Sequence, residues 1–354
     1  MQTKRLEYLD FIKGIAIILV VFCHRVIIPQ ESVLGTVCMM LVCSAVPCFM
    51  MCSGYILLFR KERAMNSLRR AMHVYVCMVI WKALYLVYFQ LIAPFETDMQ
   101  HVLRYLFVFY NLRGVETEHF WFLQAYLPAL LVTPLFAPMF CERRYGMIAG
   151  FTGLAYFSNQ FVMSINLLFD FGSKYIGYKF FDVNTLSNIF PIGGEYSSML
   201  VCFLLGGVFR LLEEKGVTRK PKFLLASALC AAGGLAGMLV VRYLQMGSFQ
   251  WQGKLLVAQY EWTSTLVMSF GVFGLLRYLG ENRAAEWIGR NIGRHSMGIY
   301  YLHYLCIIPL VMYVYPLLPV SLWWNVAKTA LVVAVSAGLT ALGKRVPYVR
   351  ELMR

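Results

Sequence analysis

The chain has 354 residues, of which 60% are hydrophobic and only 14% carry a charge. A soluble domain has about 45–50% apolar and about 25% charged residues, so these polar side chains are too few to cover two soluble globules. Disordered, collagen-like and small disulfide-rich proteins are excluded as well. The net charge of +14 would suggest a nucleic-acid partner in a soluble protein, but in a membrane protein the positive-inside rule explains it without one.

Ten apolar segments are long enough to cross a bilayer, which takes about 20 residues. They cover residues 12–28, 33–59, 71–92, 120–140, 146–163, 195–212, 222–244, 255–279, 296–315 and 321–342. We expect helices, because each span must satisfy its own backbone hydrogen bonds in lipid. The sequence therefore predicts an all-α polytopic membrane protein with about ten transmembrane helices, built as a single domain over residues 1–354.

Most of the 32 Lys and Arg residues lie in alternate loops. The main basic clusters fall within residues 60–70, 210–222, 277–294 and 344–354, whereas the loops between them carry few cations. Cytoplasmic loops of membrane proteins are enriched in Lys and Arg. This asymmetry predicts that both termini are cytoplasmic, which requires an even number of helices.

Two of the expected outer loops are long, at residues 93–119 and 164–194. The first contains an amphipathic stretch from His101 to Tyr110, which we expect along the membrane interface. The second is rich in Asn, Gly and aromatic residues, a composition that suits sugar recognition. An ordinary connecting loop is the alternative interpretation.

The ten Cys residues are scattered singly, and no Cys-x-x-Cys motif occurs. Closely spaced Cys pairs are the usual sign of zinc or redox chemistry. We therefore expect neither chemistry, and no metal in the functional site.

Lys13 and His24 are the most informative ionisable residues in the apolar segments, because such residues are costly in lipid. Eleven positions separate them, so on a helix they lie about 20° apart on one face and about 16 Å apart along the axis. One helix face would carry a cation near the inner surface and a titratable base in the outer half. A buried neutral imidazole can accept a proton from a hydroxyl, so His24 is the candidate base. A packing histidine and a snorkelling lysine are the alternatives.

Four other ionisable residues stand out in the apolar segments: Lys82, Glu261, His303 and Lys328. Glu261 is expected in the eighth helix, about 9 Å below the outer surface and near the depth of His24. It is the candidate to orient the imidazole, and an ion pair with Lys328 or Lys82 is the alternative. Lys82 lies at mid-depth, where a lysine needs a partner that the sequence does not identify.

The basic stretch from Arg60 to Arg70 has two interpretations. It fits a topology signal alone. It also fits a phosphate clamp for an anionic cytoplasmic cofactor, because several cations beside a helix end can hold phosphate through charge-assisted hydrogen bonds.

Four separated stretches resemble the signatures of the acyltransferase-3 family of integral-membrane acyltransferases. The first helix contains a cation, ten further residues and a histidine, at Lys13 and His24. The other stretches are Pro47 to Tyr55, His119 to Leu123, and GRHSMGIYYLH from Gly293 to His303. Each is weak alone, but together they span nearly the whole chain in the family's order.

The resemblance implies a ten-helix acyltransferase domain in the bacterial cytoplasmic (inner) membrane. Such a protein takes an acyl group, usually acetyl, from cytoplasmic acyl-coenzyme A and transfers it to a hydroxyl of an exported or lipid-linked carbohydrate. The size of this chain is similar to that of stand-alone O-acetyltransferases of surface polysaccharides. The expected partners are acyl-CoA, a carbohydrate or glycolipid acceptor, and membrane lipid, without nucleic acid.

The resemblance also assigns candidate site residues to three groups. His24 is expected to be catalytic, with Glu261 beside it. Contacts to the donor, acetyl-CoA or another short acyl-CoA, are expected from Lys13, Arg69, Arg70, Ser53, Tyr300, Ser296 and His303. The acceptor is expected to contact His119, Trp121 and Gln124. Support for the oxyanion is expected from Ser296, Tyr300 or Gln124.

Two features depart from the family's pattern. Lys13 stands where Arg is common, which keeps the charge but loses bidentate phosphate contact. Arg70 is followed three residues later by His73, where a second Arg is usual. Both departures concern how coenzyme A phosphates would be held.

Two other functions compete with acyl transfer. A transporter or flippase for a small polar substrate would also place charges in the membrane, but no internal repeat or pair of interrupted segments is visible. A non-catalytic scaffold would not need Lys13, His24 and Glu261 at these depths.

Overall fold

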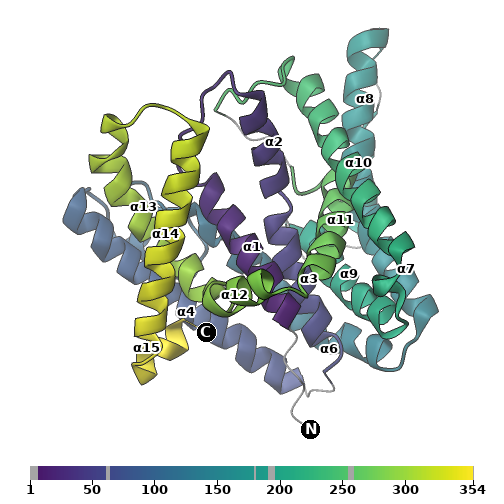
Figure 1. Ribbon diagram of the computed structural model, residues 1–354, viewed down its shortest axis with the longest axis horizontal. Coiled ribbons are helices and arrows are strands. Elements are labelled where there is room, and N and C mark those ends of the chain that lie inside the picture. Colours follow the sequence, from purple (N-terminus) through teal and green to yellow (C-terminus); the bar gives the residue numbers. More distant parts are fainter. Residues whose placement is uncertain (1–6, 61–63, 179–180, 190–195, 254–258, 354) are drawn as a thin grey trace.

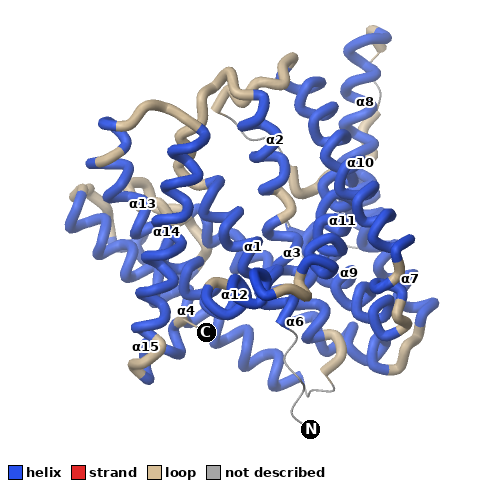
Figure 2. The backbone as a smooth tube through the Cα atoms, in the orientation of Figure 1, coloured by secondary structure: helices blue, strands red, loops and turns tan. Residues whose placement is uncertain are grey.

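The computed structural model describes residues 7–60, 64–178, 181–189, 196–253 and 259–353. Within these ranges all regular structure is helical and no strand occurs (Figure 2). The helices are α1 Glu7–Cys23, α2 Val33–Val42, α3 Ala45–Leu57, α4 Ala64–Ile92, α5 Met99–Phe107, α6 Trp121–Cys141, α7 Tyr145–Tyr156, α8 Val162–Ile176, α9 Ser197–Glu214, α10 Pro221–Met246, α11 Thr263–Leu279, α12 Arg283–Asn291, α13 Ser296–Tyr313, α14 Leu322–Gly343 and α15 Pro347–Leu352.

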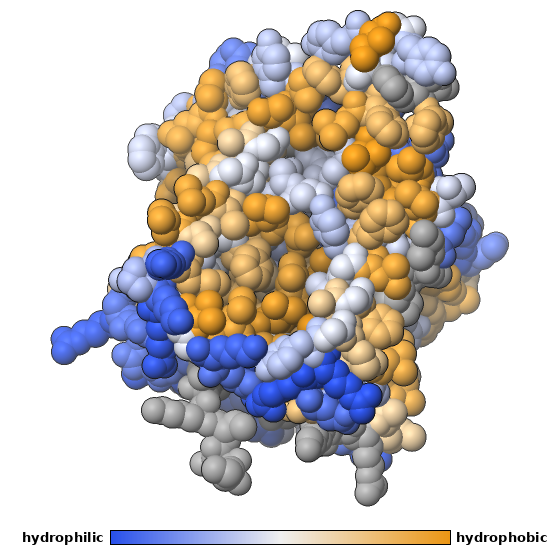
Figure 3. Space-filling view, turned by 90° about the vertical axis from the view of Figure 1, so that its right-hand side faces the viewer, coloured by the Kyte–Doolittle hydropathy of each residue, from blue (hydrophilic) through white to orange (hydrophobic). Residues whose placement is uncertain are grey.

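The all-α membrane architecture is confirmed. Six helical stretches in the described ranges are long and apolar enough to cross a membrane, and shorter apolar helices lie among them. Figure 3 shows a broad apolar surface above a charged band, which lies at the end of the molecule where the N-terminus is found in Figure 1. A lipid-facing surface bordered by water-facing charge is the pattern that a bilayer requires.

Each of the ten expected segments contains helix, but several differ in extent. The first is α1, which starts earlier than expected and ends at Cys23, so His24 lies just after the helix. The second breaks at Cys43 and Ser44 into α2 and α3. The fifth continues through a π-helical turn, Phe157–Phe161, into α8, so much of the expected outer loop is helical. The eighth begins only at Thr263, so Glu261 precedes α11 rather than lying inside it. A carboxylate is favoured just before a helix N-terminus and costly within a lipid-spanning turn, which explains this boundary.

The amphipathic stretch in the first outer loop forms α5, as expected. Asp98 caps this helix by accepting a hydrogen bond from the backbone N–H of His101 at 2.8 Å, and this bond lowers the pKa of the Asp98 carboxyl. Tyr105 is the buried residue of α5, and its carbonyl accepts a 2.8 Å hydrogen bond from Nζ of Lys82 on α4. Lys82 therefore holds α5 against the bundle.

Helix α1 lies near the centre of the bundle (Figure 1), where it contacts α3, α11, α12, α13 and α14. Close packing at its inner end depends on Gly293, which follows α12. A Cβ atom at Gly293 would lie 1.7 Å from the Asp10 carbonyl oxygen, so only glycine allows this approach. The first helix is therefore enclosed by protein over most of its length, and a polar face on it can line an internal cavity.

A buried charged cluster joins four helices at the inner end of the bundle. Glu213 on α9 accepts hydrogen bonds from the hydroxyls of Tyr8 and Tyr55 and pairs with Arg277 on α11 at 2.8 Å. The Arg277 side chain is only 5% exposed, so its charge depends on these partners. The sequence analysis did not identify this cluster, because its members are scattered over nearly 270 residues.

We expect Glu213→Gln to lower the free energy of unfolding by about 2 kcal/mol, because it removes the more buried of the two carboxylates that pair with Arg277 and leaves only the exposed Glu281. Thermal unfolding of the detergent-purified protein would show this as a lower melting temperature. The adjacent Glu214→Gln is the matched control, because Glu214 is more exposed and pairs with surface Arg143 and Arg210. Equal destabilisation by the two variants would contradict the prediction.

Candidate active site

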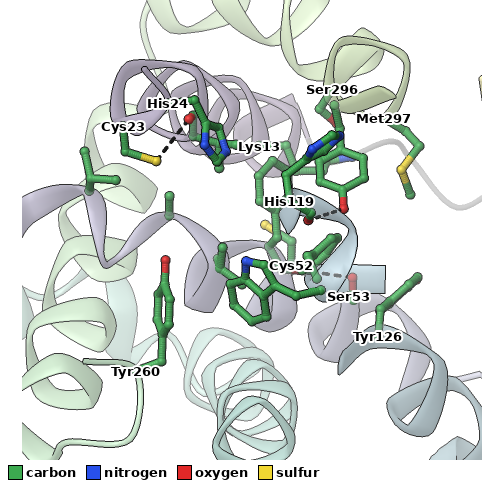
Figure 4. Close-up of a pocket in the computed structure, with 18 of the residues that line it drawn as sticks. Lys13, Cys23, His24, Cys52, Ser53, His119, Tyr126, Tyr260, Ser296 and Met297 are labelled. Carbon is green, nitrogen blue, oxygen red and sulfur yellow. Dashed lines mark hydrogen bonds between the residues drawn. The ribbon is translucent and has the colours of Figure 1, made fainter. Parts of the chain in front are cut away.

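A cavity with a volume of 310 Å³ lies beside α1. Side chains from α1, α3, α6, α13 and the loop before α11 converge on it, and Figure 4 shows several of them pointing into one space. Its polar and aromatic lining residues include Lys13, His24, Ser53, His119, Trp121, Tyr126, Tyr260, Ser296 and Tyr300. Residues far apart in the sequence thus share one polar chamber inside an apolar bundle.

Lys13 and His24 both line this cavity, although α1 ends at Cys23, so that His24 reaches the cavity from the turn after the helix and not from the expected helix face. Lys13 is not an isolated cation. Its Nζ lies 2.8 Å from Oδ1 of Asp10, which is buried and is also 3.5 Å from Nε of Arg294. The cation that lines the cavity at Lys13 is therefore held by a buried carboxylate that a second cation, Arg294, also approaches.

A second hollow, of 740 Å³, adjoins the cavity on its basic side and shares Tyr126 and Met297 with it. Arg60, Arg69, Arg70 and His73 line this hollow together with Glu351. Arg69 and Arg70 project from the first turns of α4, and Arg69 is exposed. An anionic group could therefore rest among these cations while a narrow attached chain passes Tyr126 towards the cavity.

The imidazole of His24 lies among other aromatic rings at the end of α1. Ring centroids are 5.1 Å away at Tyr304, 5.2 Å away at His303 and 6.1 Å away at His119. The ring itself makes no hydrogen bond with any residue that the structure describes. Its nitrogens are therefore available to a ligand in the cavity or to a neighbouring imidazole.

The turn that carries His24 is fixed by α14. Nζ of Lys328 donates to the carbonyls of His24 at 2.8 Å, Val21 at 3.3 Å and Phe22 at 3.4 Å. Asn325 donates to the Phe22 carbonyl and accepts from the backbone N–H of Ile27. A helix leaves its last carbonyls unpaired, and a buried ammonium group is well suited to bind them.

The chain reverses sharply after this turn. Arg25 has a φ of 49°, in the left-handed region that few non-glycine residues adopt. The Arg25 guanidinium pairs with Glu116 in the first outer loop, and this hydrogen bond raises the pKa of Arg25. The hydroxyl of Tyr315 donates to the Arg25 carbonyl. Contacts from the outer side therefore complete the positioning of His24.

His119 enters the cavity from the turn before α6. Its carbonyl accepts a 2.7 Å hydrogen bond from the Tyr300 hydroxyl, and its ring stacks on Tyr304 with a centroid distance of 4.8 Å. The Tyr300 hydroxyl proton is thus engaged with the protein. The Ser53 hydroxyl is engaged too, because it donates to the Phe49 carbonyl of its own helix.

An aromatic cluster forms the side of the cavity opposite α1. Trp121 lies against Tyr260 and Tyr196, with centroid distances of 5.1 and 5.7 Å. The Tyr196 hydroxyl donates to Oε1 of Gln124 at 3.0 Å. Gln124 therefore supports the cluster from behind Tyr196 and does not line the cavity.

The structure brings most of the predicted residues together. Those that line the cavity are Lys13, His24, Ser53, His119, Trp121, Ser296 and Tyr300. Arg69 and Arg70 line the adjoining basic hollow, and His303 is buried directly behind His24. Glu261 does not line the cavity, and Lys82 and Lys328 bond to backbone carbonyls rather than to it.

Several site residues escaped the sequence analysis. Tyr126, Tyr260, Tyr304 and Asn325 sit in apolar segments or loops, where a single tyrosine or asparagine is unremarked without tertiary contacts. The ion pair of Asp10 with Lys13 was missed as well, although a spacing of three residues on a helix is the signal that could have found it. Among the described residues, no group of three His, Cys, Asp or Glu side chains has an arrangement that would hold a metal ion.

Comparison with known proteins adds one finding. A sequence model of a family described as "Acyltransferase domain" matches residues 6–341, nearly the whole chain. No curated protein and no solved structure matches the chain significantly.

Proposed function

Because the chain belongs to the acyltransferase-3 family of membrane acyltransferases, we propose that it is an O-acyltransferase of the bacterial cytoplasmic membrane. It takes an acyl group, acetyl in the simplest case, from cytoplasmic acyl-coenzyme A. It delivers that group to a hydroxyl of an exported or lipid-linked carbohydrate. The observation that supports this most directly is the cavity that places His24 within reach of the basic hollow at the inner end of the bundle.

Coenzyme A combines phosphates with a slim pantetheine arm, and the two hollows match these parts in order. Arg60, Arg69, Arg70 and His73 supply the cations for the phosphates. The arm then passes Tyr126 and Met297, the residues common to both hollows. The thioester arrives beside His24, at the outer end of the α1 face that begins with Lys13.

His24 is placed to act as the general base. Its imidazole takes the proton from the acceptor hydroxyl as the hydroxyl oxygen attacks the thioester carbonyl. The tetrahedral intermediate then collapses, the carbon–sulfur bond breaks, and the coenzyme A thiolate receives the proton from the imidazolium. Ser296 lines the cavity and no described residue engages its hydroxyl, so it is our candidate to donate to the oxyanion.

The aromatic cluster opposite α1 suits a carbohydrate acceptor. Sugar rings present C–H faces that pack on indole and phenol rings, and Trp121 and Tyr260 supply such faces at the cavity wall. His119 also lines the cavity, with its ring centroid 6.1 Å from that of His24, so it shapes the wall between donor and acceptor. Acceptor binding on this side leaves the basic side free for the donor.

The direct test is acyl transfer by purified protein in lipid vesicles that contain a lipid-linked oligosaccharide fraction, with radiolabelled acetyl-CoA supplied on the basic side. We expect label in the carbohydrate, and a mass increase of one acetyl group. Transport of unmodified carbohydrate across the vesicle without any label would instead favour a transporter of the same fold.

We expect the double substitution of Arg69 and Arg70 by Gln to weaken coenzyme A binding roughly 10- to 100-fold, because charge-assisted bonds to phosphate are lost. Isothermal titration of coenzyme A into the detergent-purified protein measures the change. Replacing Arg219 and Lys220 by Gln removes two charges from the loop between α9 and α10 and is the matched control. Unchanged affinity in the Arg69 and Arg70 variant would remove this pair from the donor site.

A further inference from the structure

His303 on α13 is fully buried, and its protonation is fixed by its neighbours. Nδ1 lies 2.7 Å from the Tyr300 carbonyl oxygen and 3.1 Å from the Ile299 carbonyl oxygen. A carbonyl can only accept, so Nδ1 carries the proton and donates it. Nε2 is therefore the acceptor nitrogen, and it is buried without a hydrogen-bond partner among the described residues.

The rings around His303 leave one suitable donor for Nε2. The hydroxyl of Tyr300 already donates to the His119 carbonyl. The Tyr85 hydroxyl lies 3.5 Å from Nε2 of His119 and donates its own proton to the Tyr301 carbonyl. The Tyr85 oxygen can therefore only accept from His119, so Nε2 of His119 carries the proton and donates it to Tyr85. Nδ1 of His119 is then a second acceptor, not a donor.

Tyr304 also lies beside His303, with ring centroids 5.7 Å apart, but its hydroxyl is hydrogen-bonded with Arg25. The remaining neighbour is His24, whose ring has no hydrogen bond with a described residue. The His24 and His303 ring centroids are 5.2 Å apart and the rings are inclined by 32°. An in-line N–H···N bond between two imidazoles needs centres roughly 5 Å apart, so a rotation of the His24 ring is sufficient to form it. The atom Nε2 is also too deeply buried for a ligand in the cavity to reach it.

We propose that His303 is the positioning partner of His24: its Nε2 accepts the N–H of the His24 imidazole and leaves the other His24 nitrogen facing the cavity as the base. This inference rests on the proposed acyl transfer and deepens it. When His24 takes the hydroxyl proton, the imidazolium holds that proton and the one shared with His303. The first passes to the leaving thiolate, and the second stays where it was.

A base oriented by a third group is the usual arrangement of a nucleophile–base pair, and the third group is often a carboxylate. Here the groups that face His24 are Arg25 on its own turn, His119, His303 and Tyr304, and Lys328 on α14. The described surroundings of the ring thus contain no carboxylate. A neutral imidazole with a fixed acceptor nitrogen takes the place that sequence analysis gave to Glu261, and it gives His303 a role other than donor binding.

The test compares three substitutions of His303. Gln can place an acceptor where Nε2 stands, Asn reaches only the position of Nδ1, and Leu provides no polar atom. Diethyl pyrocarbonate reacts with neutral imidazole, so its reaction with His24, located by peptide mass spectrometry over a pH series, gives the pH midpoint of that ring. This readout requires no substrate and applies to the full chain in detergent.

We expect the His24 midpoint to move to lower pH in His303→Leu and His303→Asn, because the imidazolium loses its acceptor, and to stay near the original value in His303→Gln. In the acyl-transfer assay with acetyl-CoA, Leu and Asn should lower kcat about 100-fold while coenzyme A affinity stays within twofold. His101→Leu, on the exposed face of α5, is the control.

The inference is overturned if the midpoint of His24 is the same in all three variants, or if Asn preserves it and Gln does not. The latter result would mean that only the Nδ1 contact to the Tyr300 carbonyl matters, which is a structural role. If the unsubstituted protein labels His24 as expected but transfers no acetyl group, the proposed function fails and the pairing of the two imidazoles stands.

Discussion

Replacing His24 by alanine is expected to lower kcat for acyl transfer at least 1,000-fold, because no other group in the cavity is placed to take the hydroxyl proton. General-base catalysis contributes about 100- to 10,000-fold in enzymes. The affinity for coenzyme A should stay within twofold, because the phosphates are expected to bind in the basic hollow lined by Arg69 and Arg70, away from His24. Initial rates with radiolabelled acetyl-CoA and titration of coenzyme A separate these two effects.

Two controls make the His24 result specific. His101→Ala removes an exposed imidazole from α5, outside the cavity, and should leave the rate unchanged. Added imidazole should restore part of the rate to His24→Ala, because the substitution leaves a space of the right shape beside the cavity. A variant that retained more than a tenth of the original rate would show that His24 is not the base.

Replacing Lys328 by methionine should lower kcat about 100-fold. Methionine fills a similar volume but cannot bind the three carbonyls at the end of α1, so the turn that carries His24 loses its main support. A displacement of about 1 Å at a reacting group can cost this much. Steady-state rates at saturating acetyl-CoA are the measurement.

The controls for Lys328 distinguish positioning from loss of charge. Lys328→Arg keeps donors to the carbonyls and should recover a substantial part of the rate. Lys222→Met removes an exposed lysine from the start of α10 and should have no effect. If Lys328→Met and the unsubstituted protein are equally active, the contact between α14 and the end of α1 does not govern catalysis.

The local pattern in the sequence predicted Lys13 and His24 on one helix face, and both side chains do line one cavity, although α1 ends at Cys23 and His24 lies in the turn after it. Helical geometry alone sets their relative angle, so no knowledge of other helices was needed. The same holds for the apolar spans, because the demand for internal backbone hydrogen bonds leaves helices as the natural solution. The block that opens α6 and the block that includes His303 were assigned to the site through family resemblance rather than through geometry.

Glu261 shows where local reasoning was insufficient. Depth along a presumed helix placed it beside His24, but α11 starts two residues later and the carboxylate does not line the cavity. The partner of His24 came instead from α13, nearly 280 residues away in sequence. Likewise the alternative for Glu261 was an ion pair with Lys328 or Lys82, and the partner of Lys82 was left open, whereas both lysines bond to backbone carbonyls.

The sequence by itself therefore determined that this protein lies in a membrane, that it is helical, and that its first apolar segment carries Lys13 and His24. The first two follow from the composition of the whole chain, and the third follows from the spacing of residues within one segment, so none of them depends on how the helices pack. Only the tertiary structure decided which cation caps which helix end and which imidazole lies behind the base. Such pairings join residues on different helices, and in a bundle many helix arrangements bury the same apolar surface while bringing different polar atoms into contact.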